Sequence, residues 1–514
     1  MNIGFLKAGS VTDGFTVRLN KEVSPETLKI GDFLVIEGRI YKFFGIVDDL
    51  KLLSSNEDVF FDPPRSSVEK IAFNGSIYYS EAQLSPYIMA DTDGNLFAIK
   101  TIPEHFSLVR KAENKDIELV FKQGNKPFFV GTPLTMDEKI YVDLEKLAMR
   151  NNAIFGITGS GKTVLAKIVF SGIIKNDVAS LLIFDMHNEY GRSSRNEEGA
   201  PSQSLKSFFG EKVKVFDVAN NQDADDLITI PYKDIDPEDV ALVSEILHFS
   251  EKSEETAILV RRQKGNNWLK FIFSLQGKSD EEIGKISESI GVNAAALSAL
   301  IRHTTRLSEL DFLTQSDEES SISRILKYLR SGTSVVVQFS GKHKNNPLVY
   351  FLVANIITRR IHSEFEKMTD DERKNIRAMI VIEEAHKFLS TSLKERNIFG
   401  IIAREMRKFN VTIFVIDQRP SEIDPEVLSQ VGTRFVLQLM DEGDVDAVFQ
   451  GVGGGSRLKR ILRSLQPREA LLFGFAVQMP VAMKVRVFGK EFIDEITRDK
   501  RRKIDPNDAL YGGG

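Results

Sequence analysis

The stretch Gly156-Ile-Thr-Gly-Ser-Gly-Lys-Thr163 decides the fold of this chain. It fits the pattern Gly-x4-Gly-Lys-Ser/Thr and lies between an apolar segment at 152–156 and a run of helical periodicity at 164–175. A strand, a glycine-rich loop and a helix in this order are the context that a phosphate-binding P-loop requires, whereas an ordinary glycine-rich turn needs neither neighbour. The sequence therefore predicts a nucleoside triphosphate site at the start of that helix.

The composition of this loop matches the chemistry of a phosphate site. Glycines allow backbone N–H groups to close around phosphates at a helix N-terminus. Lys162 can neutralise the charge of the β- and γ-phosphates, and the Thr163 hydroxyl can bind Mg²⁺. The residues expected to surround ATP are Gly156, Thr158, Gly159, Ser160, Gly161, Lys162, Thr163 and Val164.

A later apolar segment ends in two carboxylates. Residues 379–382 lead directly into Glu383 and Glu384. An acidic pair at the end of a strand is often only a solvated terminus, but downstream of a P-loop it is typical of a Walker B segment. We expect Glu383 to hold magnesium, through water, and Glu384 to polarise the attacking water.

Two arginines and a glutamine follow in the next helix and strand. Arg404 and Arg407 are three residues apart in an expected helix at 402–409, so they share a face that could reach a neighbour's γ-phosphate. Surface ion pairing is the simpler alternative for both. Gln418 comes directly after the expected strand 411–417 and can sense the γ-phosphate or orient water, unless it only forms the turn before Pro420.

The segment Asp185-Met-His187-Asn-Glu189-Tyr190 ends the expected strand after the P-loop helix. Its alternating Asp, His and Glu are compatible with a metal site, but neither a second His cluster nor a cysteine completes one. A place for Asp185 beside the magnesium is favoured, and a purely structural loop is the third alternative.

The pattern outside these motifs divides the chain. Short apolar runs with turn residues up to about residue 130 predict a small β-barrel or sandwich. Beyond residue 141, apolar strands alternate with helical stretches, which indicates βαβ units and a mostly parallel sheet. Residues 236–330 have helical periodicity and contain Trp268, so we expect a helical insertion there. The expected core strands are 152–156, 180–185, 334–338, 378–383, 411–417 and 434–439.

Composition excludes several classes of protein. The 514 residues are 42% hydrophobic and 27% charged, as in soluble globular proteins, with a formal net charge of −5 and no cysteine. A uniformly basic nucleic-acid coat, a disulfide scaffold and a thiolate site are thereby excluded. We see no apolar run long enough to span a bilayer and no secretory leader, so the cytoplasm is the expected location.

Together these segments resemble the HerA family, within the larger HerA and FtsK group of hexameric motor ATPases. The resemblance covers most of the chain. It is carried by an N-terminal β-domain, Arg150, the P-loop, the Asp185-x-His187-x-Glu189-Tyr190 segment, a helical insertion, Ile382-Glu-Glu-Ala-His386, Ile402-Ala-Arg-Glu-x-Arg-Lys-Phe409 and Gln418-Arg-Pro420.

The resemblance implies roles for particular residues. Lys162, Thr163, Glu383 and Glu384 would form the catalytic site in cis. Arg407 matches the family's arginine finger, which acts on a neighbouring subunit, with Arg404 as the fallback. Arg150 matches a further arginine near the nucleotide, and Gln418 matches the sensor glutamine.

The resemblance also implies a fold and an assembly. The fold class would be α/β, a RecA-like P-loop core with a helical insertion, preceded by a small N-terminal β-barrel. The domains would be the barrel over 1–130, the core over 131–235 and 331–483, the insertion over 236–330, and over 484–514 a C-terminal arm that contacts the neighbouring subunit. Six subunits would form a ring that translocates double-stranded DNA at the expense of ATP, with Mg²⁺.

The partner and the wider role are left open by the resemblance. Family members act with a NurA-like nuclease in DNA end processing or with other effectors, such as sirtuin-type NAD hydrolases, in anti-phage defence. A scaffold that uses nucleotide to assemble such an effector is the alternative function. A conjugation or secretion ATPase would need a membrane element that we do not find.

This chain departs from the family pattern at Asn151, Met406, Asn410 and Asp417. Its acidic net charge requires that any DNA contact be local, because affinity for DNA follows the phosphates that a channel neutralises. Candidate channel residues are Arg192, Arg195, Lys394 and Arg396, although solvated surface is the favoured interpretation of each.

Overall fold

The computed structural model describes residues 2–56, 61, 64–66, 68–69, 73–192, 194–195, 201–219, 224–243, 247, 250–315, 320–374, 376–391, 398–453 and 455–502. The chain divides into two compact units. The first contains Met1–Val169, Gln418–Ser421 and Val431–Phe488, and the second contains Phe170–Asp417, Glu422–Gln430 and Gly489–Gly514.

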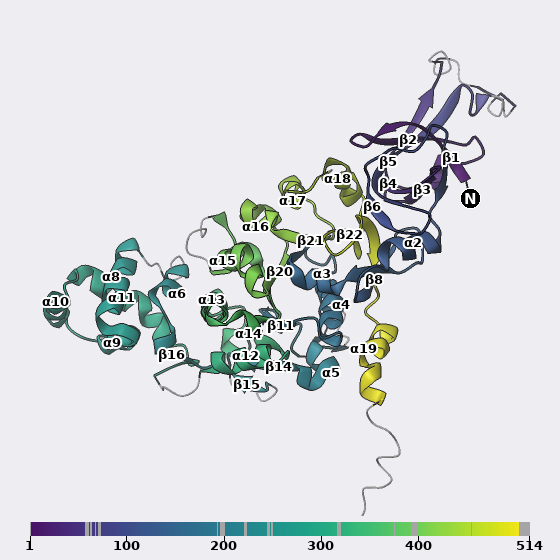
Figure 1. The fold of residues 1–514 in the computed structure, drawn as a ribbon. Helices are drawn as coiled ribbons and strands as arrows, with labels where there is room; N and C mark the ends of the chain where they lie inside the picture. Colours follow the sequence, from purple (N-terminus) through teal and green to yellow (C-terminus); the bar gives the residue numbers. More distant parts are fainter. Residues whose placement is uncertain are drawn as a thin grey trace, which may run out of the picture. The chain divides into compact units, whose positions relative to one another are not determined.

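The first unit begins with a closed β-barrel, as the sequence predicts (Figure 1). Six antiparallel strands close in the order β2-β1-β7-β3-β4-β5 and back to β2, and β6 extends the edge of β5. Alternate side chains such as Phe15, Val17, Leu34 and Leu84 fill the interior. The strands are β1 (Asn2–Ser10), β2 (Gly14–Leu19), β3 (Phe33–Glu37), β4 (Lys42–Ser54), β5 (Tyr78–Ala90), β6 (Leu96–Ala98) and β7 (Leu108–Lys111).

The remainder of the first unit carries the P-loop. Strand β10 (Asn151–Phe155) runs parallel to β21 (Val431–Val436). Both strands were expected, although β21 begins and ends three residues before the predicted 434–439. An antiparallel series that the sequence pattern did not predict continues from β21. Its members are β22 (Glu469–Gly474), β23 (Val481–Val485), β8 (Pro127–Pro133) and β9 (Ile140–Asp143).

Helix α18 (Gly455–Arg463) joins the barrel to this part of the first unit. Arg457 donates to the backbone oxygen of Thr12 at 2.7 Å, and its Nε lies 3.8 Å from the buried carboxylate of Asp48 on β4. Arg460 lies 3.4 Å from Asp49. Burial raises the pKa of Asp48, against the hydrogen bond from Ser85 and the charges of both arginines. The barrel is thus attached to α18 by charged groups as well as by packing.

The second unit is built on a parallel sheet, which the alternation of strands and helices predicts. Its order is β15-β14-β18-β11-β19-β20, and every residue of β11, β18, β19 and β20 is buried. Four strands have the expected bounds, namely β11 (Ser180–Asp185), β18 (Ser334–Gln338), β19 (Ala378–Glu383) and β20 (Val411–Asp417). Strands β14 (Val213–Asp217) and β15 (Asp226–Leu227) were not expected.

Helices connect the strands of this sheet along the chain. Helices α8, α9, α10 and α11 lie together in a separate helical part (Figure 1). The insertion contains α6 (Pro237–Leu242), α8 (Glu251–Lys264), α9 (Trp268–Ser274), α10 (Asp280–Ser289), α11 (Ala294–Ser308) and α12 (Ser321–Arg330). Buried Asp239 of α6 accepts hydrogen bonds from Asn355 at 2.7 Å and Arg359 at 2.9 Å, both on α13 (Pro347–Lys367). This pairing ties the insertion to the sheet's longest helix. Among the described residues, none of the helices has the length and apolar character to cross a bilayer.

The single tryptophan offers a test of the insertion. Trp268 is fully buried and donates its indole N–H to the backbone oxygen of Ile235 at 2.8 Å. We therefore expect its fluorescence to be blue-shifted relative to free tryptophan and weakly quenched by iodide, and to shift to the red only when the insertion unfolds. Trp268→Phe supplies the background spectrum. Emission that resembles free tryptophan in the native protein would contradict this placement.

Candidate nucleotide site

The P-loop occupies the turn between β10 and α4 (Lys162–Lys175) in the first unit. Gly159 and Gly161 have φ angles of 77° and 107°, which only glycine adopts readily. A Cβ on Gly156 would lie 2.7 Å from Ser160 Oγ and 2.9 Å from Leu437 Cβ, so this glycine is required by space. The loop therefore presents backbone N–H groups at the start of a helix, as a phosphate cradle requires.

Two predicted side chains are joined to this loop by hydrogen bonds. Lys162 Nζ donates to the backbone oxygens of Gly156 at 2.8 Å and Ile157 at 3.0 Å, so its ammonium lies within the curve of the loop. Thr158 Oγ1 donates to Gln418 Oε1 at 2.8 Å. Gln418 thus contacts the P-loop of its own chain, where a sensor of the nucleotide has to be.

Arg150 lies elsewhere in the first unit. It immediately precedes β10, whereas the P-loop follows the other end of this strand, roughly 15 Å away at the usual rise per residue. Its guanidinium stacks on the ring of Phe475, 4.3 Å from the centroid. The structure does not bring Arg150 to the P-loop of the same chain.

The second unit holds the two carboxylates, Glu383 and Glu384, that the sequence predicts for a Walker B segment. Glu383 ends β19 and is buried, and its Oε2 atom has no hydrogen-bond partner among the described residues. Burial, and then the nearby negative charge of Asp185, raise the pKa of Glu383 well above its usual value. A buried carboxylate oxygen without a donor is stabilised by a cation, so this residue fits a magnesium site.

Asp185 ends the neighbouring strand β11 and organises the loop that follows. It is fully buried, and its carboxylate accepts backbone N–H bonds from Glu189 at 2.7 Å, Tyr190 at 2.8 Å and Gly191 at 3.0 Å. Burial raises the pKa of Asp185, although these donors oppose the shift. Within the described residues no group of three His, Cys, Asp or Glu side chains is placed to hold a metal alone.

Glu384 has an unusual backbone. Its φ and ψ angles are 49° and 44°, in the left-handed region that a residue with a Cβ seldom adopts. Such strain persists only where the surroundings enforce it, and it gathers at functional sites. Here the enforcing contacts come from the turn directly after Glu384, which sequence reasoning did not identify.

His386 and Asp417 fix that turn. The backbone N–H of His386 donates to Asp417 Oδ2 at 2.6 Å, and its ring Nδ1 lies 3.0 Å from the same oxygen. Burial lowers the pKa of His386, but the hydrogen bond and charge of Asp417, with smaller effects of Glu384 and Glu422, outweigh it and raise the pKa overall. The ends of β19 and β20 are thereby locked together.

The arginine segment is less regular than expected. Helix α15 (Ile398–Glu405) ends before Arg407, and η9 (Met406–Phe409) continues as a tighter 3-10 turn, so the two arginines do not share one α-helix. Arg404 is half-buried, and the side chain of Arg407 lies outside the described part of the structure.

The candidate DNA-contacting residues have mixed outcomes. Arg192 is engaged inside the protein, 2.9 Å from the buried carboxylate of Asp217. Lys394, Arg396 and the side chain of Arg195 lie outside the described residues.

A P-loop at the start of α4 and a parallel sheet whose strands end in Asp185, Glu383 and Asp417 are the elements of a P-loop ATPase. Residues 128–361 match the family model described as the central domain of the helicase HerA. Over this region the chain is similar to the HerA helicases.

Individual relatives agree. The chain is 24% identical over 530 residues to the DNA double-strand break repair helicase HerA of Sulfolobus acidocaldarius, covering 100% of both chains. It is also 24% identical to the Pyrococcus furiosus protein of the same name, over 78% of this chain and 77% of that one. In fold, it is similar to the bacterial conjugative coupling protein TrwB, with a TM-score of 0.50 and 12% identity over 74% of this chain and 93% of that chain.

The His386–Asp417 pair predicts a pH-dependent contribution to stability. Because the folded state raises the pKa of His386, its contribution is complete below the unfolded value of about 6.5 and is lost as the pH rises through the higher folded value. We expect His386→Gln to lower the stability of the second unit by about 1–3 kcal/mol at acidic pH, and by less at alkaline pH. Thermal unfolding across a pH series measures this, and an equal loss at every pH would contradict it.

Proposed function

We propose that this protein is a ring-forming, Mg²⁺-dependent ATPase that translocates double-stranded DNA. The observation that carries the proposal is the combination of an intact P-loop with a buried Walker B strand, in a chain similar from end to end to DNA double-strand break repair helicases. The charge chemistry of both parts suits a nucleoside triphosphate and a divalent cation.

The residues of the chain would divide the work of hydrolysis. The P-loop N–H groups and Lys162 bind and orient the phosphates, and Thr163 with Glu383 would hold magnesium, which supplies positive charge against the phosphate oxygens. Glu384 accepts a proton from the attacking water as general base. Its strained backbone fixes the direction of the carboxylate, and Gln418 relays the state of the site to the P-loop through Thr158.

The position of Arg150 supports an active site shared between subunits. An arginine at the far end of β10 does not serve its own P-loop, but in a ring it can face the nucleotide of the next subunit. We propose that Arg150 and Arg407, with Arg404 as the fallback, complete the site of a neighbour, and that six copies close the ring. Helix α19 (Lys490–Arg502) lies within the proposed C-terminal arm, and Lys175 of the same chain donates a hydrogen bond to the backbone oxygen of Glu495 on this helix. The proposal that the arm contacts a neighbouring subunit therefore rests on the family resemblance.

Substitutions in the catalytic residues test the ATPase. Lys162→Ala should abolish ATP binding and hydrolysis, whereas Glu384→Gln should retain binding and lose hydrolysis by about 10²–10⁴-fold, because only the proton acceptor is removed. Phosphate release with and without linear duplex DNA measures both, and the wild type should be stimulated by DNA. Normal turnover in Glu384→Gln would contradict the assigned base.

Mixing experiments test whether the site is shared. Arg407→Ala should lower turnover by about 10³–10⁵-fold as a pure protein. Mixed with Lys162→Ala subunits, it should regain activity, because some interfaces then combine an intact P-loop with an intact arginine. Arg404→Ala and Arg150→Ala, mixed in the same way, show which arginine acts in trans. A monomer that hydrolyses ATP at full speed would contradict the shared site.

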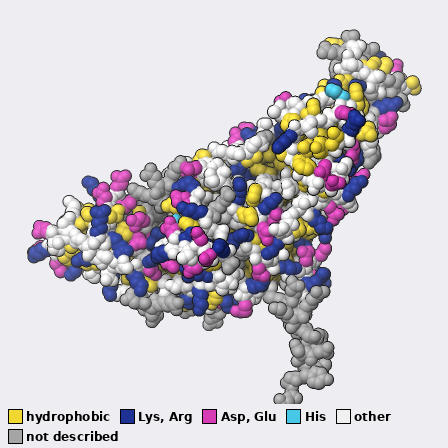
Figure 2. Space-filling view, viewed as in Figure 1, with side chains coloured by type: hydrophobic (Ala, Val, Ile, Leu, Met, Phe, Trp, Pro, Cys, Tyr) yellow, Lys and Arg dark blue, Asp and Glu magenta, His cyan; other side chains and the backbone are white. Residues whose placement is uncertain are grey.

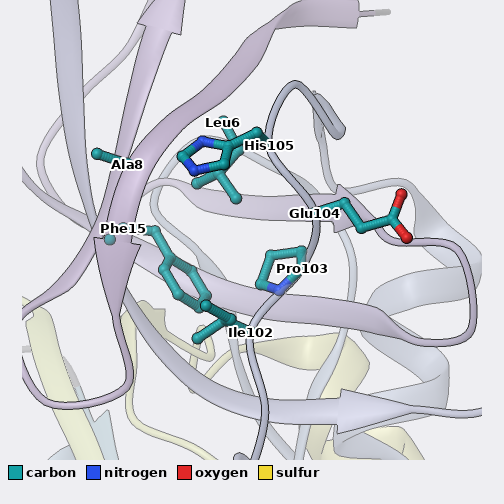
Figure 3. A pocket seen from close by; sticks show the side chains of 8 residues that line it. Leu6, Ala8, Phe15, Ile102, Pro103, Glu104 and His105 are labelled. Atoms are coloured by element: carbon teal, nitrogen blue, oxygen red, sulfur yellow. The ribbon is translucent and has the colours of Figure 1, made fainter.

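The barrel has a surface suited to a protein partner. Ile102, Phe106 and Leu108 are 53%, 71% and 55% exposed, and Figure 2 shows hydrophobic side chains gathered over the barrel. Next to them lies a cavity of about 370 Å³ between β1 and the 102–105 loop, where Phe15, Ile102 and Pro103 form an apolar wall and the Glu104 carboxylate points away (Figure 3).

We propose that an effector, a nuclease or another DNA-end-processing or defence enzyme, docks on this face. The alternative function, a nucleotide-controlled scaffold for such an effector, is favoured by the same surface. In that case nucleotide binding would control effector activity more than DNA movement.

Charged substitutions on the barrel separate binding from hydrolysis. Ile102→Glu combined with Phe106→Glu should abolish co-purification with the proposed effector and leave ATP hydrolysis unchanged. Val487→Glu, at an 81%-exposed position outside the barrel, is the matched control. Retained co-purification would overturn the proposed docking face. If DNA-stimulated ATP hydrolysis were lost while the effector was still activated, the alternative function, a nucleotide-controlled scaffold, would be favoured.

A further inference from the structure

Arg468 lies in the connection between α18 and β22, and its backbone is strained. Its φ angle is 67°, in the left-handed region. Glycine or asparagine takes this conformation at little cost, whereas arginine does not. A long cationic side chain at such a position indicates that the side chain itself has a use there.

The P-loop holds Arg468 in place. The backbone N–H of Arg468 donates to the oxygen of Ser160 at 3.1 Å, and the N–H of Val485 donates to the oxygen of Arg468 at 2.9 Å. A Cβ built on Gly161 would lie 3.9 Å from Arg468 Cγ. The aliphatic stem of Arg468 therefore runs beside the glycine that immediately precedes Lys162, within the same unit.

The guanidinium group has no structural partner. Arg468 is exposed, and no hydrogen bond or ion pair engages its side chain among the described residues. Other arginines of this unit are engaged, including Arg434, which donates to the oxygen of Val448, and Arg457 on the barrel. The backbone of Arg468 is thus held beside the P-loop, and its guanidinium group is free to bind a ligand.

We propose that Arg468 binds the phosphate chain of the nucleotide held by its own P-loop. This inference rests on the proposed function, because it requires a nucleotide there. The planar fork of arginine pairs with phosphate oxygens, and it would add a second positive group in cis to that of Lys162. It differs from Arg150, Arg404 and Arg407, which are proposed to act on a neighbouring subunit.

The backbone strain provides a sharp test. Arg468→Gly removes the guanidinium and relieves the left-handed strain, so nucleotide affinity should fall about 10- to 100-fold, as expected for charged hydrogen bonds, while the thermal midpoint stays equal or rises. Arg468→Asn should show the same loss of nucleotide affinity, and it replaces Arg468→Gly if the glycine variant does not fold. Arg468→Lys should restore part of the affinity. Asn345→Gly, at a φ of 55° far from these residues in sequence, is the control for strain relief alone.

Affinities for a non-hydrolysable ATP analogue and for inorganic tripolyphosphate are measured on the full-length protein. Phosphate contact predicts the same loss for both ligands. A loss for the analogue alone would overturn the proposal in favour of contact with the base, and wild-type affinity of Arg468→Gly for both would overturn it outright. Lys162→Ala distinguishes failure of the Arg468 proposal from failure of the proposed function. If neither the wild type nor Lys162→Ala binds the ATP analogue, the proposed function itself is wrong.

Discussion

Buried negative charge at the carboxyl edge of a parallel sheet is the constraint on which the second unit depends. Adjacent strands β11, β19 and β20 end in Asp185, Glu383 and Asp417, and all three carboxylates are buried. Each is compensated differently. Asp185 receives three backbone N–H groups, Asp417 receives His386, and Glu383 keeps one oxygen without a donor. Folding alone thus leaves one buried carboxylate oxygen without a partner, and a bound cation would supply one.

Sequence periodicity predicted the strands that are buried on both faces. Continuous apolar runs such as 180–185 and 378–383 have the expected bounds because a central parallel strand needs no polar face. The antiparallel strands β22 and β23 were missed although residues 470–473 are apolar, because the prediction relied on strands that alternate with helices, and no helix separates these two. Asn410 was noted only as a departure from the family pattern. Its φ of 59° gives the physical reason for an asparagine there, because asparagine tolerates the left-handed region.

The candidate site was predictable where it is local in sequence. The P-loop and the Glu383–Glu384 pair follow from adjacent residues. The His386–Asp417 contact joins residues from two strands, and the strain at Glu384 depends on it, so neither could be read from local pattern. The position of Arg150 could be seen only in the structure, because β10 lies between it and the P-loop and places the two at opposite ends of the strand. Arg468 carried no motif at all, and only its backbone reveals it.

Helix α18 has a mechanical consequence. One face of it is fastened to the barrel through Arg457 and Arg460, and its carboxyl end leads within five residues to the segment bonded to Ser160. A force on the barrel would be transmitted through α18 and the segment that follows it to the P-loop. A displacement of the barrel relative to the rest of this unit would therefore shift the backbone on which the position of Ser160 depends.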